Sequence, residues 1–543
     1  MFQASVILLA LPIISLGQDL PTICLQNGAC YQGSWKDSLS SRYASFKGIR
    51  FAQHPIGKLR FKSPEPFIAQ EGLHDVSQES NITCPNYSAK EDNSAVKGQE
   101  DCLVLNIFVP KIVFDQPQIS ELPVMFWIHG GGLTGGSGSS YNPRYLMDEE
   151  IVLITSNYRL GTLGFLSLGT MEVPGNAGFR DQTMAMTWVK ENIQYFGGNS
   201  NSITIFGESA GALSVAMHLM SPKSEGLFHR AIMQSGTALA PTWGMNTPER
   251  AVSLGNLLAK GLECDQEEEI LACMQAKPME DIIALSNLMH TYPLDNLTPN
   301  WNGVPDLNFT NDPFFLGDAE TLLASGQFNT DVEVIIGSNS DEGILGIFPI
   351  LQGMPWTDFA QINWPARLFN IANTSNISPQ DIENANKILE FYVGSVENIN
   401  EEHMQEVIDM FTDADFLYGT FKTINYLLKQ EVKVYQFLLT FEGSHSSVEG
   451  FGIDPMGVCH GDDLIYLWDI FGNLSGNDKI VSDLMIEAWI NFAKYGDPTP
   501  ASWTWTPAWD MVAHYWNISG SYPRMATNQH IQSRMELWSQ IVG

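Results

Sequence analysis

The chain has few basic residues. Its 543 residues include 28 Lys and Arg against 61 Asp and Glu, which gives a formal net charge of −33 at pH 7. A charge this negative is repelled by phosphate backbones and by anionic lipids, so neither nucleic acid nor an anionic membrane is expected as a partner. Solubility is the plainest explanation of the charge. The alternative is an acidic mouth that attracts cationic substrates, which depends on where the carboxylates lie.

Long apolar runs are also missing. The best candidate, residues 6–16, contains Pro12 and is too short to span a bilayer. Small residues at positions 15–17 suit a signal peptidase, so residues 1–17 are predicted to be a signal peptide, although no Lys or Arg precedes the apolar run. The C-terminus carries neither a KDEL-type signal nor a lipid-anchor tail. We therefore expect a secreted, extracellular protein without a membrane anchor.

Sites for N-linked glycan agree with this secretory route. Eight N-x-[ST] sequons occur, and each is a predicted glycosylation acceptor. They lie at Asn81, Asn86, Asn296, Asn308, Asn373, Asn376, Asn473 and Asn517. The sequence leaves open which of them carry glycan.

Cysteine is scarce, at seven residues. In an exported chain this number predicts disulfides with one thiol left over. Two short loops would be closed by local pairs, namely Cys84 with Cys102 and Cys264 with Cys273. Cys24 and Cys30 are a further candidate pair, which the sequence does not settle. The remaining thiol, Cys459 beside His460, is expected to be buried and inert rather than a nucleophile.

The chain lacks internal repeats, low-complexity stretches and Pro/Ser-rich linkers, and its composition, with 44% hydrophobic residues, is that of a globular protein. Short apolar stretches predict strands at residues 103–109, 122–128, 151–155, 202–206, 231–234, 332–336 and 435–440. A helix is predicted over residues 181–195. Strands that alternate with helices predict a doubly wound, mostly parallel α/β sheet.

Two helix-rich stretches, residues 244–328 and 346–430, are expected to be insertions between sheet strands that cover one end of the sheet. We therefore predict one catalytic domain over residues 18–543, with helices on both faces of a large sheet, rather than two independent domains.

The most informative stretch is Gly207-Glu208-Ser209-Ala210-Gly211, which fits the G-x-S-x-G pattern of a nucleophile elbow. A strand is predicted before it, and a helix over residues 210–220 follows. A serine on so tight a turn needs glycines around it because strand and helix approach closely. The helix also points its first amides at the serine, where negative charge develops.

A serine needs a base to accept its proton, and the base needs a third group to orient it. In this fold both partners come later in the chain, the acid before the histidine. Glu342 follows the predicted strand 332–336 directly, at the sheet edge where ligands bind. His460 lies between glycines in a predicted loop further on. Ser209, Glu342 and His460 are therefore the candidate catalytic residues.

The oxyanion of the tetrahedral intermediate that a serine nucleophile forms needs amide donors. A glycine run, His129-Gly130-Gly131-Gly132 continued by Gly135-Gly136-Ser137-Gly138, follows a predicted strand and offers backbone N–H groups. A flexible linker is the alternative explanation. A phosphate-binding loop is set aside because the G-x-x-x-x-G-K-[ST] motif is absent.

With these motifs, the chain resembles the type-B carboxylesterase family, which includes cholinesterases and many secreted insect esterases. The resemblance extends from about Tyr31 to the C-terminus. Besides the elbow, the glycine run and the His460 loop, it rests on residues 100–106, 157–161, 176–182 and 340–343.

The resemblance implies an α/β-hydrolase fold and a Ser209–Glu342–His460 triad. It further implies an oxyanion hole from the amides of Gly131, Gly132 and Ala210, the disulfides Cys84–Cys102 and Cys264–Cys273, and the buried ion pairs Arg60–Glu100 and Arg159–Asp181. In the pocket it implies Glu208 beside the nucleophile, Ser235 near the histidine and Trp243 at the acyl group.

Departures from the subfamilies are informative as well. The loop between Cys84 and Cys102 has no tryptophan, whereas cholinesterases carry there the ring that binds a quaternary ammonium. Choline esters are therefore poor candidate substrates. Juvenile hormone esterases typically have Gln where this chain has Glu208, which speaks against that assignment.

The sequence therefore predicts a secreted, glycosylated serine carboxylesterase that hydrolyses apolar carboxylic esters through an acyl-enzyme, without metal or organic cofactor. The alternative is a non-catalytic or stoichiometric cholinesterase-like binding or scavenger protein. The particular ester, the biological role and the oligomeric state are left open.

Overall fold

The computed structural model describes residues 20–78, 80–87, 96–116, 121–266, 269–289, 301–369, 371, 376–509, 514–527 and 529–542. The predicted signal peptide and the sequons Asn296 and Asn373 lie outside the described residues. Among the described helices, none combines the length and the apolar character that a membrane span requires.

The described part of the chain contains one large mixed sheet. Its strands, in spatial order, are β16 (Arg524–Ala526), β15 (Tyr515–Ile518), β14 (Val434–Leu439), β13 (Glu333–Asn339), β12 (Arg230–Gln234), β11 (Gly198–Glu208), β9 (Leu122–Ile128), β10 (Val152–Ser156), β8 (Val104–Pro110), β4 (Arg42–Arg50) and β3 (Ser34–Asp37). The strands from β15 to β10 run parallel to one another, and the strands at both edges are antiparallel.

Smaller β elements lie beside this sheet. They are β1 (Thr22–Cys24), β2 (Ala29–Gln32) and β5 (Gly72–Asp75), which form one sheet, and the pair β6 (Asn86–Tyr87) and β7 (Val96–Lys97).

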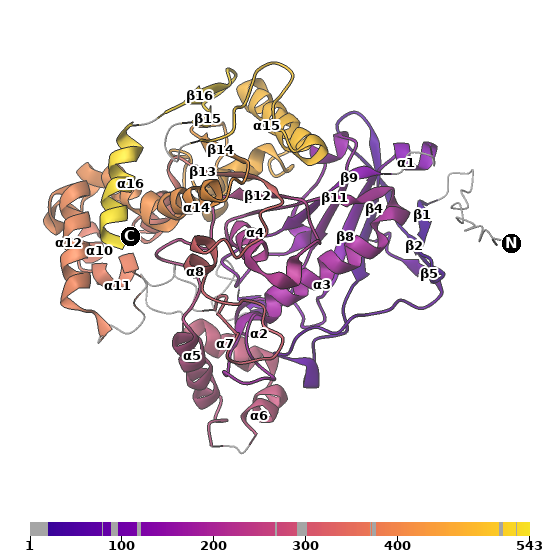
Figure 1. Cartoon of the computed structure of the whole chain (residues 1–543), viewed down its shortest axis with the longest axis horizontal. Helices are drawn as coiled ribbons and strands as arrows, with labels where there is room; N and C mark the ends of the chain where they lie inside the picture. The colour runs from indigo at the N-terminus through magenta and orange to yellow at the C-terminus, as the bar shows by residue number, and fades with distance from the viewer. Residues whose placement is uncertain are drawn as a thin grey trace.

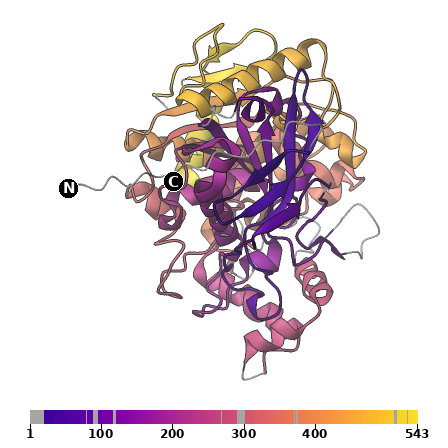
Figure 2. The ribbon, with the colours of Figure 1, turned by 90° about the vertical axis from the view of Figure 1, so that its right-hand side faces the viewer.

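Both faces of the large sheet are covered, as the unbroken apolar strands predict. In β9, Phe126 packs into the core on one side of the sheet and Trp127 packs into the core on the other. The first core lies under α3 (Ala177–Asn192) and α4 (Ala210–Met220), and the second lies under α15 (Gly476–Tyr495). Figure 2 shows α15, coloured orange, lying over the sheet.

The two helix-rich insertions carry the remaining helices. The first contains α5 (Pro248–Gly261), α6 (Ile270–Ala276), α7 (Met279–Leu288) and α8 (Ala319–Ala324). The second contains α9 (Phe348–Leu351), α10 (Trp356–Phe359), α11 (Trp364–Phe369), α12 (Pro379–Val393), α13 (Met404–Thr412) and α14 (Tyr418–Lys429). Two short helices, α1 (Ile112–Asp115) and α2 (Gly161–Phe165), lie earlier in the chain, and α16 (Gln529–Val542) ends it.

The second insertion has an apolar core of its own. Ile344, Phe411 and Trp538 belong to it, so the C-terminal helix α16 packs on the insertion. Figure 1 shows α16 beside α12, α10 and α11, at the side of the molecule away from β1, β2 and β5.

Three disulfides close local loops: Cys24–Cys30, Cys84–Cys102 and Cys264–Cys273. Cys84–Cys102 and Cys264–Cys273 were predicted. The pairing of Cys24 with Cys30, which the sequence left open, is present as well. Cys459 is a free, buried thiol, and burial raises its pKa, as expected of an inert cysteine.

Both ion pairs implied by the family resemblance are present. Arg60 binds Glu100 through two hydrogen bonds of 2.6 Å. Arg159 binds Asp181 with side chains that are only 2% and 0% exposed. Removing one partner of such a buried pair costs about 3 to 5 kcal/mol, because it leaves an uncompensated charge in the interior. These pairs hold the fold around the site and do not touch the reacting groups.

Candidate active site

Ser209 lies on a sharp turn between β11 and α4. Its backbone has φ 60° and ψ −126°, outside the usual range of a residue with a side chain. A Cβ on Gly207 would lie 2.5 Å from the carbonyl carbon of Gly211, and one on Gly211 would lie 2.0 Å from the Ile128 oxygen. Only glycine fits at these two positions, which is the physical reason for the G-x-S-x-G pattern.

His460 and Glu342 meet Ser209 in one hydrogen-bonded chain. His460 Nε2 lies 2.8 Å from Ser209 Oγ, and His460 Nδ1 lies 2.7 Å from Glu342 Oε2. The other carboxylate oxygen of Glu342 accepts a 2.7 Å hydrogen bond from the Asn339 amide, and the residue is fully buried. Three residues from distant parts of the sequence are thus arranged as a nucleophile, a base and an orienting acid.

Hydrogen bonds to Asp462 and Ser447 fix the loop that carries His460. The Asp462 carboxylate accepts hydrogen bonds from the Cys459 and Ser447 amides, at 2.8 and 2.7 Å. Ser447 Oγ donates to the His460 carbonyl oxygen at 2.7 Å. The imidazole position is therefore fixed by hydrogen bonds to its backbone as well as by Glu342.

The glycine run after β9 faces the serine. A Cβ on Gly130 would lie 3.0 Å from Ser209 Cβ, so this backbone touches the nucleophile. Gly131 and Gly132 have φ of 105° and 62°, a conformation that favours glycine. Among the described residues, the amides of Gly131, Gly132 and Ala210 donate no hydrogen bond to a protein acceptor, and all three residues line the pocket. The three predicted oxyanion-hole amides are thus gathered and available.

Three buried carboxylates surround the imidazole. Besides Glu342, Glu208 Oε1 lies 3.2 Å from His460 Nε2, and Asp463 follows in the same loop. Burial raises the pKa of Glu208, and the charges of Asp463 and Glu342 raise it further, while His460 lowers it. Burial also raises the pKa of Asp463, to about 6, although a hydrogen bond from Gln234 lowers it. The carboxylates of Glu208 and Glu342 outweigh burial and raise the pKa of His460.

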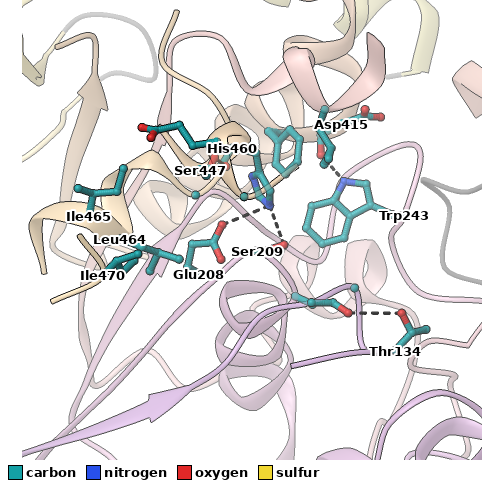
Figure 3. A pocket seen from close by; sticks show the side chains of 18 of the residues that line it. Thr134, Glu208, Ser209, Trp243, Asp415, Ser447, His460, Leu464, Ile465 and Ile470 are labelled. Carbon is teal, nitrogen blue, oxygen red and sulfur yellow. Dashed lines mark hydrogen bonds and ion pairs between the residues drawn. The ribbon is translucent and has the colours of Figure 1, made fainter. Parts of the chain in front are cut away.

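Ser209 and His460 line a cavity of about 810 Å³. Figure 3 shows Trp243 on one side of the Ser209–His460 pair, and Glu208, Leu464, Ile465 and Ile470 on the other. Most of the wall is apolar, as small-molecule sites usually are. Phe416 completes the Trp243 side, with its ring centroid 5.5 Å from that of Trp243.

Three carboxylates line this cavity, those of Glu208, Asp415 and Glu449. Asp415, which lines it, is paired with Arg367 at 2.7 Å. Glu449, also in the wall, accepts hydrogen bonds from the Ser446 amide and from His445. Two of the three carboxylates are therefore paired or hydrogen-bonded to other groups, and the third, Glu208, lies beside His460.

Other predicted residues lie as follows. Ser235 is buried directly after β12, and its Oγ has no hydrogen-bond partner among the described residues. Of the sequons, Asn81, Asn308, Asn376 and Asn473 are exposed, while Asn86 and Asn517 are partly buried. Their glycosylation stays a prediction.

Sequence reasoning missed several residues of the site. Phe416 lies with its ring 4.6 Å from the His460 ring, but nothing in its sequence neighbourhood marks it. Gln234 connects Asp463, at 2.5 Å, to the Trp489 indole, at 3.0 Å. For Asp463 a signal existed, because it lies three residues after His460 in a strongly acidic loop.

The site has the arrangement of an α/β-hydrolase. A nucleophile elbow lies between a parallel strand and a helix, and the acid and the histidine lie on later loops. The comparisons with known proteins agree. A model of the carboxylesterase family matches residues 23–538. The chain therefore belongs to the carboxylesterase family, and it is a carboxylic ester hydrolase.

Three relatives illustrate the similarity. The chain is 34% identical to the juvenile hormone esterase of Tribolium castaneum, over 86% of this chain and 82% of the relative. It is 33% identical to venom carboxylesterase-6 of Apis mellifera, over 93% and 91%. The crystal structure of juvenile hormone esterase from Manduca sexta, with OTFP covalently attached, superimposes with a TM-score of 0.85 at 26% identity, covering 96% of this chain and all (100%) of that one. The predicted family and the predicted α/β-hydrolase fold are thereby confirmed.

Proposed function

We propose that this chain is a secreted serine carboxylesterase that hydrolyses apolar esters through an acyl-enzyme on Ser209. The observation that carries the proposal is the continuous chain of hydrogen bonds from Ser209 Oγ through His460 to Glu342, beside three amides that donate no hydrogen bond within the described part of the chain. The covalent OTFP of the Manduca sexta structure supports a covalent mechanism in this family.

In the first half of the reaction, Ser209 Oγ attacks the ester carbonyl carbon while His460 Nε2 takes the hydroxyl proton. The negative carbonyl oxygen is stabilised by the amides of Gly131, Gly132 and Ala210. Glu342 stabilises the imidazolium and fixes its tautomer. The C–O bond to the alcohol then breaks, the alcohol leaves with the proton from His460, and the acyl group stays on Ser209.

In the second half, water replaces the alcohol. His460, neutral again, takes a proton from water, which attacks the acyl carbon through the same tetrahedral geometry. The bond to Ser209 breaks, its oxygen regains the proton, and a carboxylic acid leaves. No redox step and no co-reactant besides water is needed.

The lining of the cavity supports apolar esters as substrates. We assign the acyl group to the side of Trp243 and Phe416, and the alcohol to the side of Leu464, Ile465 and Ile470. Choline esters are poorer candidates, because the Cys84–Cys102 loop has no tryptophan whose ring could bind the quaternary ammonium.

The acid limb of the pH–rate profile is expected above the ordinary imidazole value, because only neutral His460 accepts the serine proton. Burial alone lowers the pKa of His460, but Glu208 and Glu342 outweigh it and hold the pKa above its ordinary 6.5. We expect kcat/KM to fall with decreasing pH, with a midpoint above 6.5. The Glu208→Gln variant, which lacks the nearer of the two charges to Nε2, should shift that midpoint to lower pH. An identical midpoint in both proteins would contradict this electrostatic account.

The experiment that tests the proposal against the stoichiometric alternative is a time course with p-nitrophenyl acetate in excess. A carboxylesterase releases nitrophenol steadily over many turnovers, because water removes each acyl group. A scavenger releases one equivalent per protein and stops. A stoichiometric burst without later turnover would overturn the proposal.

The domain limits and the cellular route belong to the same proposal. We assign residues 1–17 to a signal peptide and residues 18–543 to one catalytic domain. Three disulfides support passage through an oxidising compartment. Exposed sequons at Asn81, Asn308, Asn376 and Asn473 are positioned for glycan addition.

A further inference from the structure

The helix that runs from α13 into α14 is interrupted by one π-helical turn, Asp413–Leu417. The Tyr418 amide donates to the Asp413 carbonyl oxygen, five residues back instead of four. Such turns occur frequently at functional sites, because the extra residue changes which side chains face a pocket. Here the turn presents Phe416 between the rings of His460 and Trp243, at 4.6 and 5.5 Å.

Asp415, in the middle of this turn, connects the pocket wall to a buried arginine. Its carbonyl oxygen accepts a hydrogen bond from the Trp243 indole (Figure 3). Its carboxylate binds Arg367 of α11 through two hydrogen bonds of 3.0 and 2.7 Å, with side chains that are 5% and 3% exposed. A bidentate, buried pair of this kind has one geometry and little freedom.

Arg367 is itself held in place. Its guanidinium lies 4.5 Å from the ring of Phe411, in the core of the second insertion. On a helix, residues two apart point in roughly opposite directions, so Asp413 faces away from Asp415. Asp413 binds Arg534 of α16. The π-helical turn is thus fixed by arginines from two different helices.

The segment before Trp243 packs directly on the same helix. A Cβ on Gly419 would lie 2.8 Å from the Ala240 amide and 2.8 Å from Thr237 Oγ1, so the two backbones are in contact. Trp243 and Phe416 are therefore joined to one helix surface, and a shift of the π-helical turn moves both rings.

We propose that Arg367, through Asp415, is a positioning residue that fixes the Trp243 and Phe416 side of the pocket and thereby limits the length of the acyl group. Arg367 touches no reacting atom. The inference rests on the proposed function, because it assigns the acyl group to this side of Ser209.

The test measures acyl selectivity, which a merely structural role would leave unchanged. The readout is the ratio of kcat/KM for p-nitrophenyl hexanoate to kcat/KM for p-nitrophenyl acetate. Arg367→Gln removes the charge partner of Asp415, so the π-helical turn can move. The Trp243 and Phe416 side of the pocket can then accommodate longer acyl groups. We expect the ratio to rise about tenfold, the low end of the discrimination that one methylene group gives in an apolar pocket.

Three further variants make the result specific. Phe416→Ala should raise the ratio by itself, and Arg367→Gln added to it should raise the ratio by less than it does in the wild type, because only the Trp243 ring is left for it to position. Asp415→Asn keeps the backbone carbonyl and the side-chain volume, and it repeats the test if Arg367→Gln does not fold. Arg60→Gln breaks a buried bidentate pair away from the pocket and should leave the ratio at the wild-type value.

A wild-type ratio in folded Arg367→Gln or Asp415→Asn would overturn the inference, as would a full additive effect in the Phe416→Ala background. Neither result would contradict the proposed function, because the enzyme would still turn over substrate. The proposed function has a separate test: turnover retained by the Ser209→Ala variant would contradict it.

Discussion

Replacement of Ser209 by alanine is expected to lower kcat for p-nitrophenyl acetate by about 10⁴- to 10⁶-fold. In the proposed mechanism Ser209 Oγ forms the acyl bond, and it lies 2.8 Å from His460 Nε2, the proposed base. Without it, neither half of the mechanism proceeds. Substrate binding should persist, because the apolar walls and the three amides remain. The measurement is a steady-state rate at saturating substrate, with an intact-mass check that no wild-type protein is present.

Ser202→Ala is the matched control for this variant. It removes a serine hydroxyl from the same strand, β11. Ser202 Oγ donates a 3.4 Å hydrogen bond to the Ala493 carbonyl and accepts a 3.2 Å hydrogen bond from Arg230, and neither partner lines the pocket. Its kcat should equal that of the wild type. Turnover in Ser209→Ala within tenfold of the Ser202→Ala value would remove Ser209 from the chemistry.

Replacement of Glu342 by glutamine is expected to lower kcat by about 10³- to 10⁴-fold. The side chain keeps its size, but an amide presents a donor or a neutral acceptor where Nδ1 now meets a carboxylate at 2.7 Å. The imidazolium loses its stabilising charge, and the tautomer that leaves Nε2 free to accept a proton is no longer favoured. KM should change little, because Glu342 is fully buried and does not line the cavity.

Asp306→Asn serves as the control for Glu342→Gln. Asp306 is also fully buried, and its carboxylate accepts hydrogen bonds from the Phe314 and Phe315 amides, away from the pocket. Its loss should lower stability and leave kcat unchanged. If both variants lost activity equally, the effect at Glu342 would be one of folding and not of catalysis.

Much of the sheet could be predicted from the sequence because parallel strands buried on both faces are almost wholly apolar. Residues 122–128 and the helix 210–220 were predicted with the limits that β9 and α4 have. The polar ends of strands were harder to predict. β11 begins at Gly198, four residues before the predicted start at Ser202, because polar residues there continue the strand beyond its buried part.

The candidate triad could also be predicted from the sequence, because a glycine pattern marks Ser209 and the chain order of the fold selects Glu342 and His460. The residues that form the walls of the pocket could not be predicted. Phe416 lies in a π-helical turn, and the acidic residues of that turn bind Arg367, 48 residues before Asp415, and Arg534, 121 residues after Asp413. No local pattern encodes contacts of that range.

The most direct test of the central claim is mass spectrometry of the protein mixed with p-nitrophenyl acetate and quenched in acid during turnover. We predict an added mass of one acetyl group, on the peptide that contains Ser209 and on no other. The adduct should accumulate further in Glu342→Gln if its deacylation slows more than its acylation. Continued turnover with no acetyl group on Ser209, or with the acetyl group on another residue, would contradict the acyl-enzyme mechanism.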